Sequence, residues 1–232
     1  MKIKIFTYSL VVFVLLIWVS FTTWEMLKYK NKYLDITDKQ RWENTLGSNG
    51  VYDDNLIVFF GDSQIDRWAM ATSFGSLPIK NKGISGDWAL KSLKRLDADV
   101  LNLNPSIMVL LIGINDLGNG QSTDEIVNNI EKILHRAQDK TIEIILCSLL
   151  PVRGKYLKDV SLEDILIINQ NLKRISKEHN INFVDFHSEL TDIEGKFSLG
   201  LTADGLHPNE KGYLKMSEIL LPYIIKTIVK KS

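Results

Sequence analysis

The feature that most constrains the fold is a regular alternation of apolar runs and helical patterns after residue 55. Most of the apolar runs are rich in Val, Ile and Leu and lack the polar alternation of a half-exposed strand. They are NLIVFF (55–60), PIKNKGI (78–84), SIMVLLIG (106–113), IEIILCSL (142–149) and INFVDF (181–186). We therefore expect an α/β domain in which helices cover both faces of a five-stranded parallel sheet.

Helical periodicity fills the gaps between these runs, at 64–73, 87–100, 123–138 and 161–179, and a last helix runs from Pro208 to about Lys230. The third of these patterns has a clear start, with Ser122 or Thr123 as the cap and acidic residues in the first turn. In open parallel sheets, ligands bind beyond the carboxyl ends of the strands. Functional residues are therefore expected directly after strands.

The N-terminal part departs from this pattern. Residues 5–24 (IFTYSLVVFVLLIWVSFTTW) carry no charge over 20 residues, and a helix of that length spans ~30 Å, the thickness of a bilayer's hydrocarbon core. A cleaved signal peptide is the alternative, but its apolar region is usually shorter and VSFTTWEM is a poor match to a small-residue cleavage site. We expect a membrane anchor over 1–28, a linker over 29–50 and one domain over 51–232.

The orientation of this anchor is read from the charges around it. Two lysines precede the apolar stretch, and five basic residues follow it by position 41. Counted by the positive-inside rule, this would keep the domain in the cytoplasm. Large domains often override that count, and a short basic N-terminus is typical of a signal anchor, so we expect a membrane protein whose domain lies outside the cytoplasm.

Composition and motifs exclude several classes of function. Lys+Arg and Asp+Glu both number 28, so the formal net charge is zero, without the basic excess of a nucleic-acid-binding protein. The single cysteine, Cys147, lies in an apolar run and cannot form an internal disulfide. The sequence lacks an H-E-x-x-H, paired-cysteine or G-x-x-x-x-G-K pattern, so we expect neither a zinc site nor a nucleotide site.

Four polar clusters lie at the predicted sheet edge: GDS (61–63), GISGDW (83–88), GIND (113–116) and DGLHPN (204–209). The first three follow strands, and the fourth precedes the last helix. A Gly-Asp-Ser tripeptide alone is an ordinary turn with a capping serine. The combination of the four clusters is what indicates chemistry.

Acyl transfer needs a nucleophile, a base, a group that orients the base, and hydrogen-bond donors for the oxyanion. Ser63 supplies a hydroxyl at a predicted helix N-terminus, where the dipole favours negative charge. His207 can take its proton, and Asp204 lies three residues earlier in a glycine-containing loop. The backbone amides of Ser63 and Gly86 and the side-chain amide of Asn115 are the candidate oxyanion donors.

Other polar residues in these clusters are expected to have supporting roles. Asp62 is expected to brace the turn by hydrogen bonds, and Asp116 to be a local support. His187, just after the last predicted strand, is the one competitor to His207 and ranks below it. Surface positions are expected for His135 and His179.

These residues make the chain resemble the SGNH hydrolases, also called the GDSL-like family. The four blocks of that family are matched by Ser63, Gly86, Asn115 and His207, and Asp204 matches the acid of its D-x-x-H element. The resemblance covers about residues 55–230. It implies a flavodoxin-like three-layer α/β/α fold and a serine esterase that uses neither a metal nor a cofactor.

Within that family, the chain is most similar to the platelet-activating-factor acetylhydrolase-like and carbohydrate-esterase-like branch, which favours short acyl groups. GDSQIDRW lacks a glycine that often follows the serine block, and Trp88 stands where threonine is common. Arg67, Trp68 and Trp88 are therefore the candidate substrate-pocket residues. The segment PVRGKYLKDVSL (151–162) follows the fourth strand and is a candidate cover of the site.

The resulting hypothesis is an esterase that hydrolyses small esters, such as O-acetyl groups on a glycan or a short acyl lipid. Acyl transfer to a cell-envelope carbohydrate is the alternative, because the same residues serve both reactions. An inactive binding module is disfavoured because Ser63, Asn115 and His207 are all present.

Overall fold

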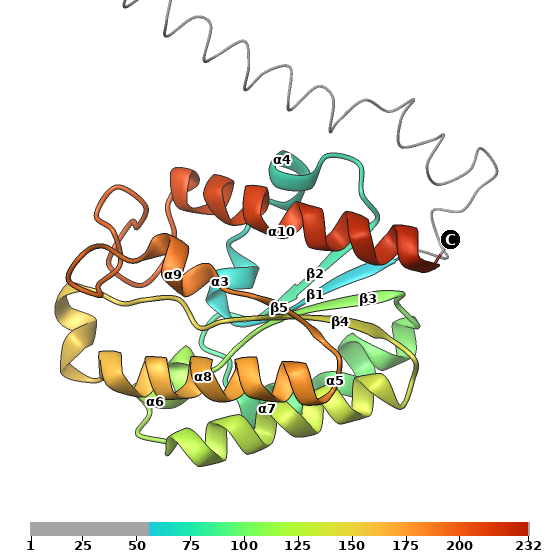
Figure 1. The fold of residues 1–232 in the computed structure, drawn as a ribbon, viewed down its shortest axis with the longest axis horizontal. Coiled ribbons are helices and arrows are strands. Elements are labelled where there is room, and N and C mark those ends of the chain that lie inside the picture. Colours follow the sequence, from blue (N-terminus) through green and yellow to red (C-terminus); the bar gives the residue numbers. More distant parts are fainter. Residues whose placement is uncertain (1–55, 232) are drawn as a thin grey trace, which may run out of the picture. The chain divides into compact units, whose positions relative to one another are not determined.

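A five-stranded parallel sheet forms the centre of the domain, in the order β2-β1-β3-β4-β5 (Figure 1). The computed structural model describes residues 56–231. Its strands are β1 Ile57–Gly61, β2 Ile79–Gly83, β3 Ile107–Leu111, β4 Glu143–Cys147 and β5 Asn182–Val184. The predicted sheet is therefore confirmed. β2 is added on one side of β1, and β3, β4 and β5 are added on its other side. The direction of winding therefore reverses between β1 and β3, where a ligand crevice is expected.

Helices cover both faces of this sheet and form three layers (Figure 1). The longer helices α5, α7 and α8 lie on one face, and α10 lies with α4 and α9 on the other. The helical segments are α3 Ser63–Asp66, α4 Met70–Phe74, α5 Ala89–Asp99, η1 Leu101–Leu103, α6 Ile114–Gly118, α7 Thr123–Gln138, η2 Gly154–Lys158, α8 Leu162–Glu178, α9 Phe186–Leu190 and α10 Glu210–Lys231. Ser122 caps α7 in a capping box with Glu125, as its sequence predicts.

The core follows from the strand sequences. Every residue of β1 and β3 is buried, and because successive side chains point to opposite faces, unbroken apolar runs supply both helical layers. Phe59 packs against the rings of Trp68 and Phe74, whereas Phe60 belongs to the cluster that α5, α7 and α8 complete. The edge strand β2 differs from the prediction, since it is half-exposed and carries Lys and Asn side chains, which protect a sheet edge from pairing with other chains.

Two local predictions are wrong at their ends. The helix predicted over 64–73 is split into α3 and α4, and at the break Asn81 Nδ2 on β2 donates to the carbonyls of Ile65 at 2.8 Å and Trp68 at 3.4 Å. The strand predicted through 186 ends at Val184, because Asp185 caps α9 by accepting a hydrogen bond from the Ser188 amide. At both boundaries a side chain, Asn81 or Asp185, is hydrogen-bonded to the backbone.

The predicted anchor over 1–28, with its helix at 5–24, and the linker over 29–50 lie outside the described residues. Among residues 56–231, no helix combines the length and apolar character that crossing a membrane requires. The anchor, its orientation and the location of the domain stay predictions.

Candidate active site

Ser63 lies immediately beyond the carboxyl end of β1, as the first residue of α3. Asp62 caps this helix, and its Oδ1 accepts a hydrogen bond of 2.9 Å from the Gln64 amide, which is the predicted bracing role. Gly61 is required by packing, because a Cβ there would lie 2.0 Å from the Leu111 carbonyl oxygen of β3. The close approach of β1 and β3 thus fixes where the serine leaves the sheet.

The three residues predicted as nucleophile, base and orienting acid lie in one hydrogen-bonded chain. Ser63 Oγ is 2.9 Å from His207 Nε2, although the residues are 144 positions apart. His207 Nδ1 is 2.8 Å from Asp204 Oδ2. Ser63 and His207 are buried. In this arrangement Nε2 of the imidazole can accept the hydroxyl proton of Ser63, while Nδ1 is hydrogen-bonded to the Asp204 carboxylate.

The second oxygen of Asp204 is also occupied, since Oδ1 accepts hydrogen bonds of 2.9 Å from the amides of Leu206 and His207. Burial alone would raise the pKa of this carboxyl, but the hydrogen bonds from the His207 amide and ring and from the Leu206 amide lower it to about 2. Asp204 is therefore ionised at neutral pH. A fixed carboxylate of this kind holds the imidazole orientation and stabilises the imidazolium.

The candidate oxyanion donors come from three different segments of the chain. Asn115 Nδ2 donates to the Asp87 carbonyl at 2.8 Å, so this bond orients the amide and leaves its second N–H for another acceptor. Gly86 is exposed and has φ +78°, a conformation that favours glycine. The Ser63 amide is at the first turn of α3, where N–H groups lack intrahelical acceptors. Because α3 has four residues, the predicted dipole contribution is small.

Gln64 joins the serine loop to the histidine loop. Its Nε2 donates to the carbonyl of Leu206, the residue before His207, at 3.2 Å. Its own carbonyl accepts a hydrogen bond of 3.0 Å from the Tyr213 hydroxyl of α10. Gln64 is therefore hydrogen-bonded to a residue before His207 in the chain, Leu206, and to one after it, Tyr213. The local sequence around Gln64 does not indicate this role.

Arg95 on α5 connects the first two polar loops and was not predicted as a site residue. Its Nε donates to Asp87 at 2.7 Å, and Nη2 donates to the Gly61 carbonyl at 2.9 Å. A second carboxylate, Asp99, accepts from Nη1 at 2.9 Å. The partly buried guanidinium of Arg95 thus balances the charge of Asp87 and is hydrogen-bonded to the last residue of β1.

Two further carboxyl groups, those of Asp62 and Asp116, are buried in the loops that carry the proposed site residues. Both oxygens of Asp116 accept from the Ala89 amide at 3.0 Å, which is the predicted local support. Burial and the charge of Asp87 raise the pKa of Asp116 to about 6, although the hydrogen bond from Ala89 acts to lower it. Burial raises the pKa of Asp62 to about 7, against the hydrogen bond from Gln64. Asp62 Oδ2 has no hydrogen-bond partner among the described residues.

The three predicted pocket residues have different environments. Trp68 is 2% exposed, and its ring packs against those of Phe59 at 5.6 Å and Tyr213 at 5.4 Å. This packing places Trp68 in the core and corrects the expectation that it lines the pocket; its aromatic neighbours come from β1 and α10, which the local sequence does not show. Arg67 is exposed. Trp88 is half-buried, with the Lys91 ammonium 5.1 Å from its ring centroid.

A cavity of about 240 Å³ adjoins Asn115. Three residues of the segment 151–162, namely Tyr156, Asp159 and Val160, form one wall of this cavity; that the segment covers the site stays a prediction. The lining residues are Ile114, Asn115, Gly118, Asn119, Tyr156, Asp159, Val160 and Leu206. Two of these lining residues connect the cavity to the proposed site: Asn115 is a candidate oxyanion donor, and Leu206 directly precedes His207. Asn119 was not predicted; it lies four positions after Asn115, and its Nδ2 donates to the Asn115 carbonyl.

His187 does not contact Ser63. It is buried in α9, where its Nδ1 lies 3.3 Å from the Thr191 hydroxyl. Burial lowers its pKa, partly opposed by Asp185. The structure therefore brings His207, and not its competitor, to the serine.

Comparison with known proteins identifies the family and the fold. The model of the GDSL-like lipase/acylhydrolase family matches residues 49–215. A multidomain esterase of Ruminococcus flavefaciens is 28% identical over 126 residues, which cover 52% of this chain and 16% of that protein. An acetylxylan esterase of Xylanibacter ruminicola is 26% identical over 145 residues, covering 53% of this chain and 29% of its own length. The chain thus spans less than a third of these curated relatives.

Among solved structures, a GDSL-like lipase from Bacteroides thetaiotaomicron superposes with a TM-score of 0.72 at 25% identity. The match covers 82% of this chain and 97% of that protein. The likeness therefore extends over the whole of that fold.

Proposed function

The chain belongs to the GDSL-like lipase/acylhydrolase family, and on that basis we propose that it is a serine esterase that hydrolyses short-chain esters through an acyl-enzyme. The observation that carries the proposal is the bonded chain from Ser63 Oγ through His207 to Asp204, with distances of 2.9 and 2.8 Å. Such a chain activates a hydroxyl that is otherwise a weak nucleophile.

In the first half of the proposed reaction, Ser63 Oγ attacks the ester carbonyl carbon while His207 Nε2 takes the hydroxyl proton. The carbonyl π electrons move to oxygen, and the amides of Ser63, Gly86 and Asn115 donate to that oxyanion. When the intermediate collapses, the bond to the alcohol oxygen breaks and His207 returns the proton to it. The alcohol leaves, and the acyl group stays on Ser63.

Water completes the proposed cycle. His207 Nε2 takes a proton from the water as its oxygen attacks the acyl carbon, and the bond to Ser63 Oγ then breaks and Oγ regains the proton. The carboxylic acid is released and the enzyme is restored. Asp204 remains a carboxylate throughout, because the three hydrogen bonds from Leu206 and His207 stabilise its charge.

We propose a short acyl group carried by a glycan or a small lipid as the substrate. The cavity of about 240 Å³ beside Asn115 is small, which suits a short acyl group or part of one sugar ring. Its wall combines apolar Ile114 and Leu206 with the polar side chains of Tyr156 and Asp159. The acetylxylan esterase of X. ruminicola acts, by its name, on an acetylated glycan, which supports this class. The predicted anchor at 5–24 would hold the domain at a membrane, outside the cytoplasm.

The test is replacement of the proposed nucleophile. Ser63→Ala should abolish turnover of p-nitrophenyl acetate and labelling by a fluorophosphonate probe, whereas Ser188→Ala, an exposed serine of α9, should keep both. An alanine variant at position 63 that keeps either property would disprove the nucleophile. A p-nitrophenyl ester series of increasing acyl length should show the highest kcat/KM for the shortest chains.

A product analysis separates hydrolysis from transfer. With an acyl donor and a glycan acceptor present together, the proposal predicts release of the free acid. Acylated glycan as the main product would favour the acyltransferase alternative, which uses the same residues but excludes water.

A further inference from the structure

Three potential metal ligands meet where α7 and α8 end, away from the proposed active site. Glu131 and His135 lie one turn apart on α7, and His179 is the C-cap of α8. Glu131 Oε1 is 3.9 Å from His135 Nε2 and 3.6 Å from His179 Nε2. The two imidazole rings contact edge to face, with centroids 4.6 Å apart. One carboxylate oxygen thus faces two imidazoles from different helices.

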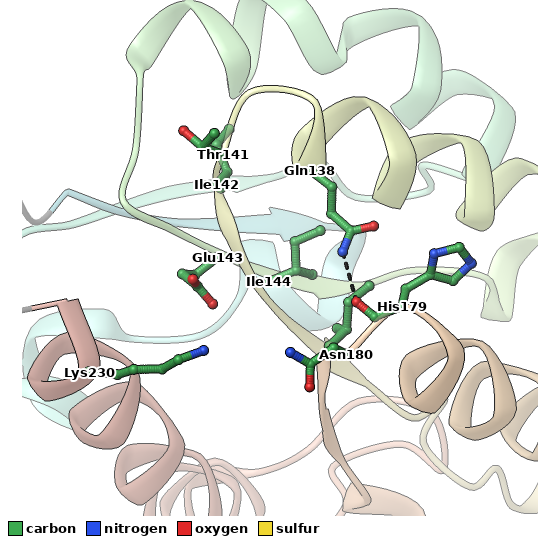
Figure 2. Close-up of a pocket in the computed structure, with 9 residues that line it drawn as sticks. Gln138, Thr141, Ile142, Glu143, Ile144, His179, Asn180 and Lys230 are labelled. Carbon is green, nitrogen blue, oxygen red and sulfur yellow. Dashed lines mark hydrogen bonds between the residues drawn. The ribbon is translucent and has the colours of Figure 1, made fainter.

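The position of His179 is fixed by its backbone. Its amide donates to the Ile175 carbonyl at 3.0 Å, and its carbonyl accepts a 3.0 Å hydrogen bond from Gln138 Nε2 of α7 (Figure 2). Asn180 follows with φ +54°, which ends the helix. Figure 2 shows the side chain of Lys230 pointing into the pocket and the ring of His179 pointing away from Lys230. The Lys230 ammonium therefore does not face the imidazole.

The electrostatic setting favours a cation. His179 stands at the C-terminal end of α8, and a helix C-terminus carries partial negative charge. Glu131 adds a carboxylate. The nearest guanidinium of α7, Arg136, is engaged by Asp97. The exposed fractions of the side chains are 32% for Glu131, 52% for His135 and 27% for His179, so an ion has access from solvent.

We propose that Glu131, His135 and His179 bind one divalent transition-metal ion, with zinc as the best match. Two imidazole nitrogens and one carboxylate oxygen are a common donor set for zinc, with water as the fourth ligand. Zinc–ligand bonds of about 2.0–2.1 Å in a tetrahedron place the ligand atoms about 3.3–3.4 Å apart. The two distances from Glu131 Oε1, 3.6 and 3.9 Å, exceed this by a few tenths of an ångström, and all three ligand atoms lie within 4.8 Å of one another, so side-chain rotations would have to bring them together. The ion would join α7 to α8.

A surface Glu–His pair of the i,i+4 type is the ordinary alternative for Glu131 and His135. It does not explain why a second imidazole, from another helix, approaches the same carboxylate oxygen. A metal ion removes the need for either imidazole to be protonated, because neutral nitrogens bind it. The two interpretations predict different responses to zinc.

The test uses the full chain without a histidine tag, freed of metal by a chelator and titrated with zinc chloride in a calorimeter. Wild type should bind one zinc equivalent that His179→Gln weakens by at least about tenfold, since loss of even an outer-shell partner costs 10–100-fold. His135→Gln should behave alike. Glu178→Gln, an exposed carboxylate of α8 paired with Arg174, is the matched control and should bind as wild type does.

Two further measurements locate the site. Zinc should raise the thermal midpoint of wild type more than that of His179→Gln at the same zinc concentration, because an ion that binds only the folded state stabilises it in proportion to its affinity. The His207→Ala variant should keep the zinc equivalent, which separates this site from the proposed base. The proposal is overturned if wild type binds no zinc, or if the His135→Gln and His179→Gln variants bind it as tightly as wild type.

Discussion

Asp62 is buried beside the proposed nucleophile, and replacing it with asparagine should change how stability depends on pH. Burial raises the pKa of its carboxyl from 3.8 to about 7. Between these values the folded protein holds a proton that the unfolded chain has released. Unfolding therefore releases a proton, and stability must fall as the pH rises through this window.

The size of the effect follows from the two pKa values. Each pH unit between them changes the free energy of unfolding by about 1.4 kcal/mol, so wild type should lose roughly 2–3 kcal/mol from this group between pH 5 and pH 7. Above pH 7 the loss levels off. Asp62→Asn has no proton to release there, and its amide oxygen can still accept the hydrogen bond from Gln64 that Asp62 Oδ1 accepts.

The assay is urea unfolding of wild type and Asp62→Asn at pH 5 and pH 7, followed by circular dichroism and tryptophan fluorescence, which must agree for a two-state analysis. Other titrating groups are common to both proteins, so the difference between them isolates Asp62. That difference should shift by roughly 2–3 kcal/mol in favour of the variant at the higher pH. Asp66→Asn, an exposed carboxylate of the same helix, is the control. An equal difference at both pH values would refute a neutral, buried Asp62.

The remaining predictions concern the groups that hold the loops of the site. Asp204→Asn should lower kcat on p-nitrophenyl acetate by about 10⁴-fold, because an amide cannot stabilise the imidazolium; a loss below tenfold would contradict its role. Gln64→Met removes the hydrogen bond to the Leu206 carbonyl, so kcat should fall with KM nearly unchanged, while urea unfolding shifts by about 1 kcal/mol or less. Arg95→Met should lower the free energy of unfolding by about 3–5 kcal/mol, because it leaves Asp87 buried without its partner; a smaller change than that of a surface Arg174→Met control would be inconsistent with this account.

The sheet and the main residues of the site could be predicted because their signals are local. An apolar run such as 106–113 is buried on both faces in any parallel arrangement, and the polar residues that follow such runs converge at one sheet edge. Ser63 and Asn115 follow from that rule, whereas His207 follows from the acyl-transfer chemistry of its side chain and from Asp204, three residues earlier.

The parts that were missed depend on contacts between distant segments. The predicted helix over 64–73 is interrupted where a side chain of β2, Asn81, donates to the carbonyls of Ile65 and Trp68. Trp68 was predicted to line the pocket, but Phe59 of β1, separated from it by a turn, and Tyr213 of α10, distant in sequence, pack against its ring and bury it. Arg95 lies in a helix with ordinary polarity, and its importance comes from the Gly61 carbonyl, 34 positions earlier.

The distance along the chain between Ser63 and His207 has a consequence for biosynthesis. The serine leaves the ribosome with the first strand of the sheet, whereas the histidine precedes only the last helix, α10. Chains emerge N-terminal end first, so through most of synthesis the serine has no base to activate it. We expect a nascent chain that stops before residue 207 to carry an inert hydroxyl, and hydrolytic competence to arise only when the final helix docks and Gln64 meets both Leu206 and Tyr213.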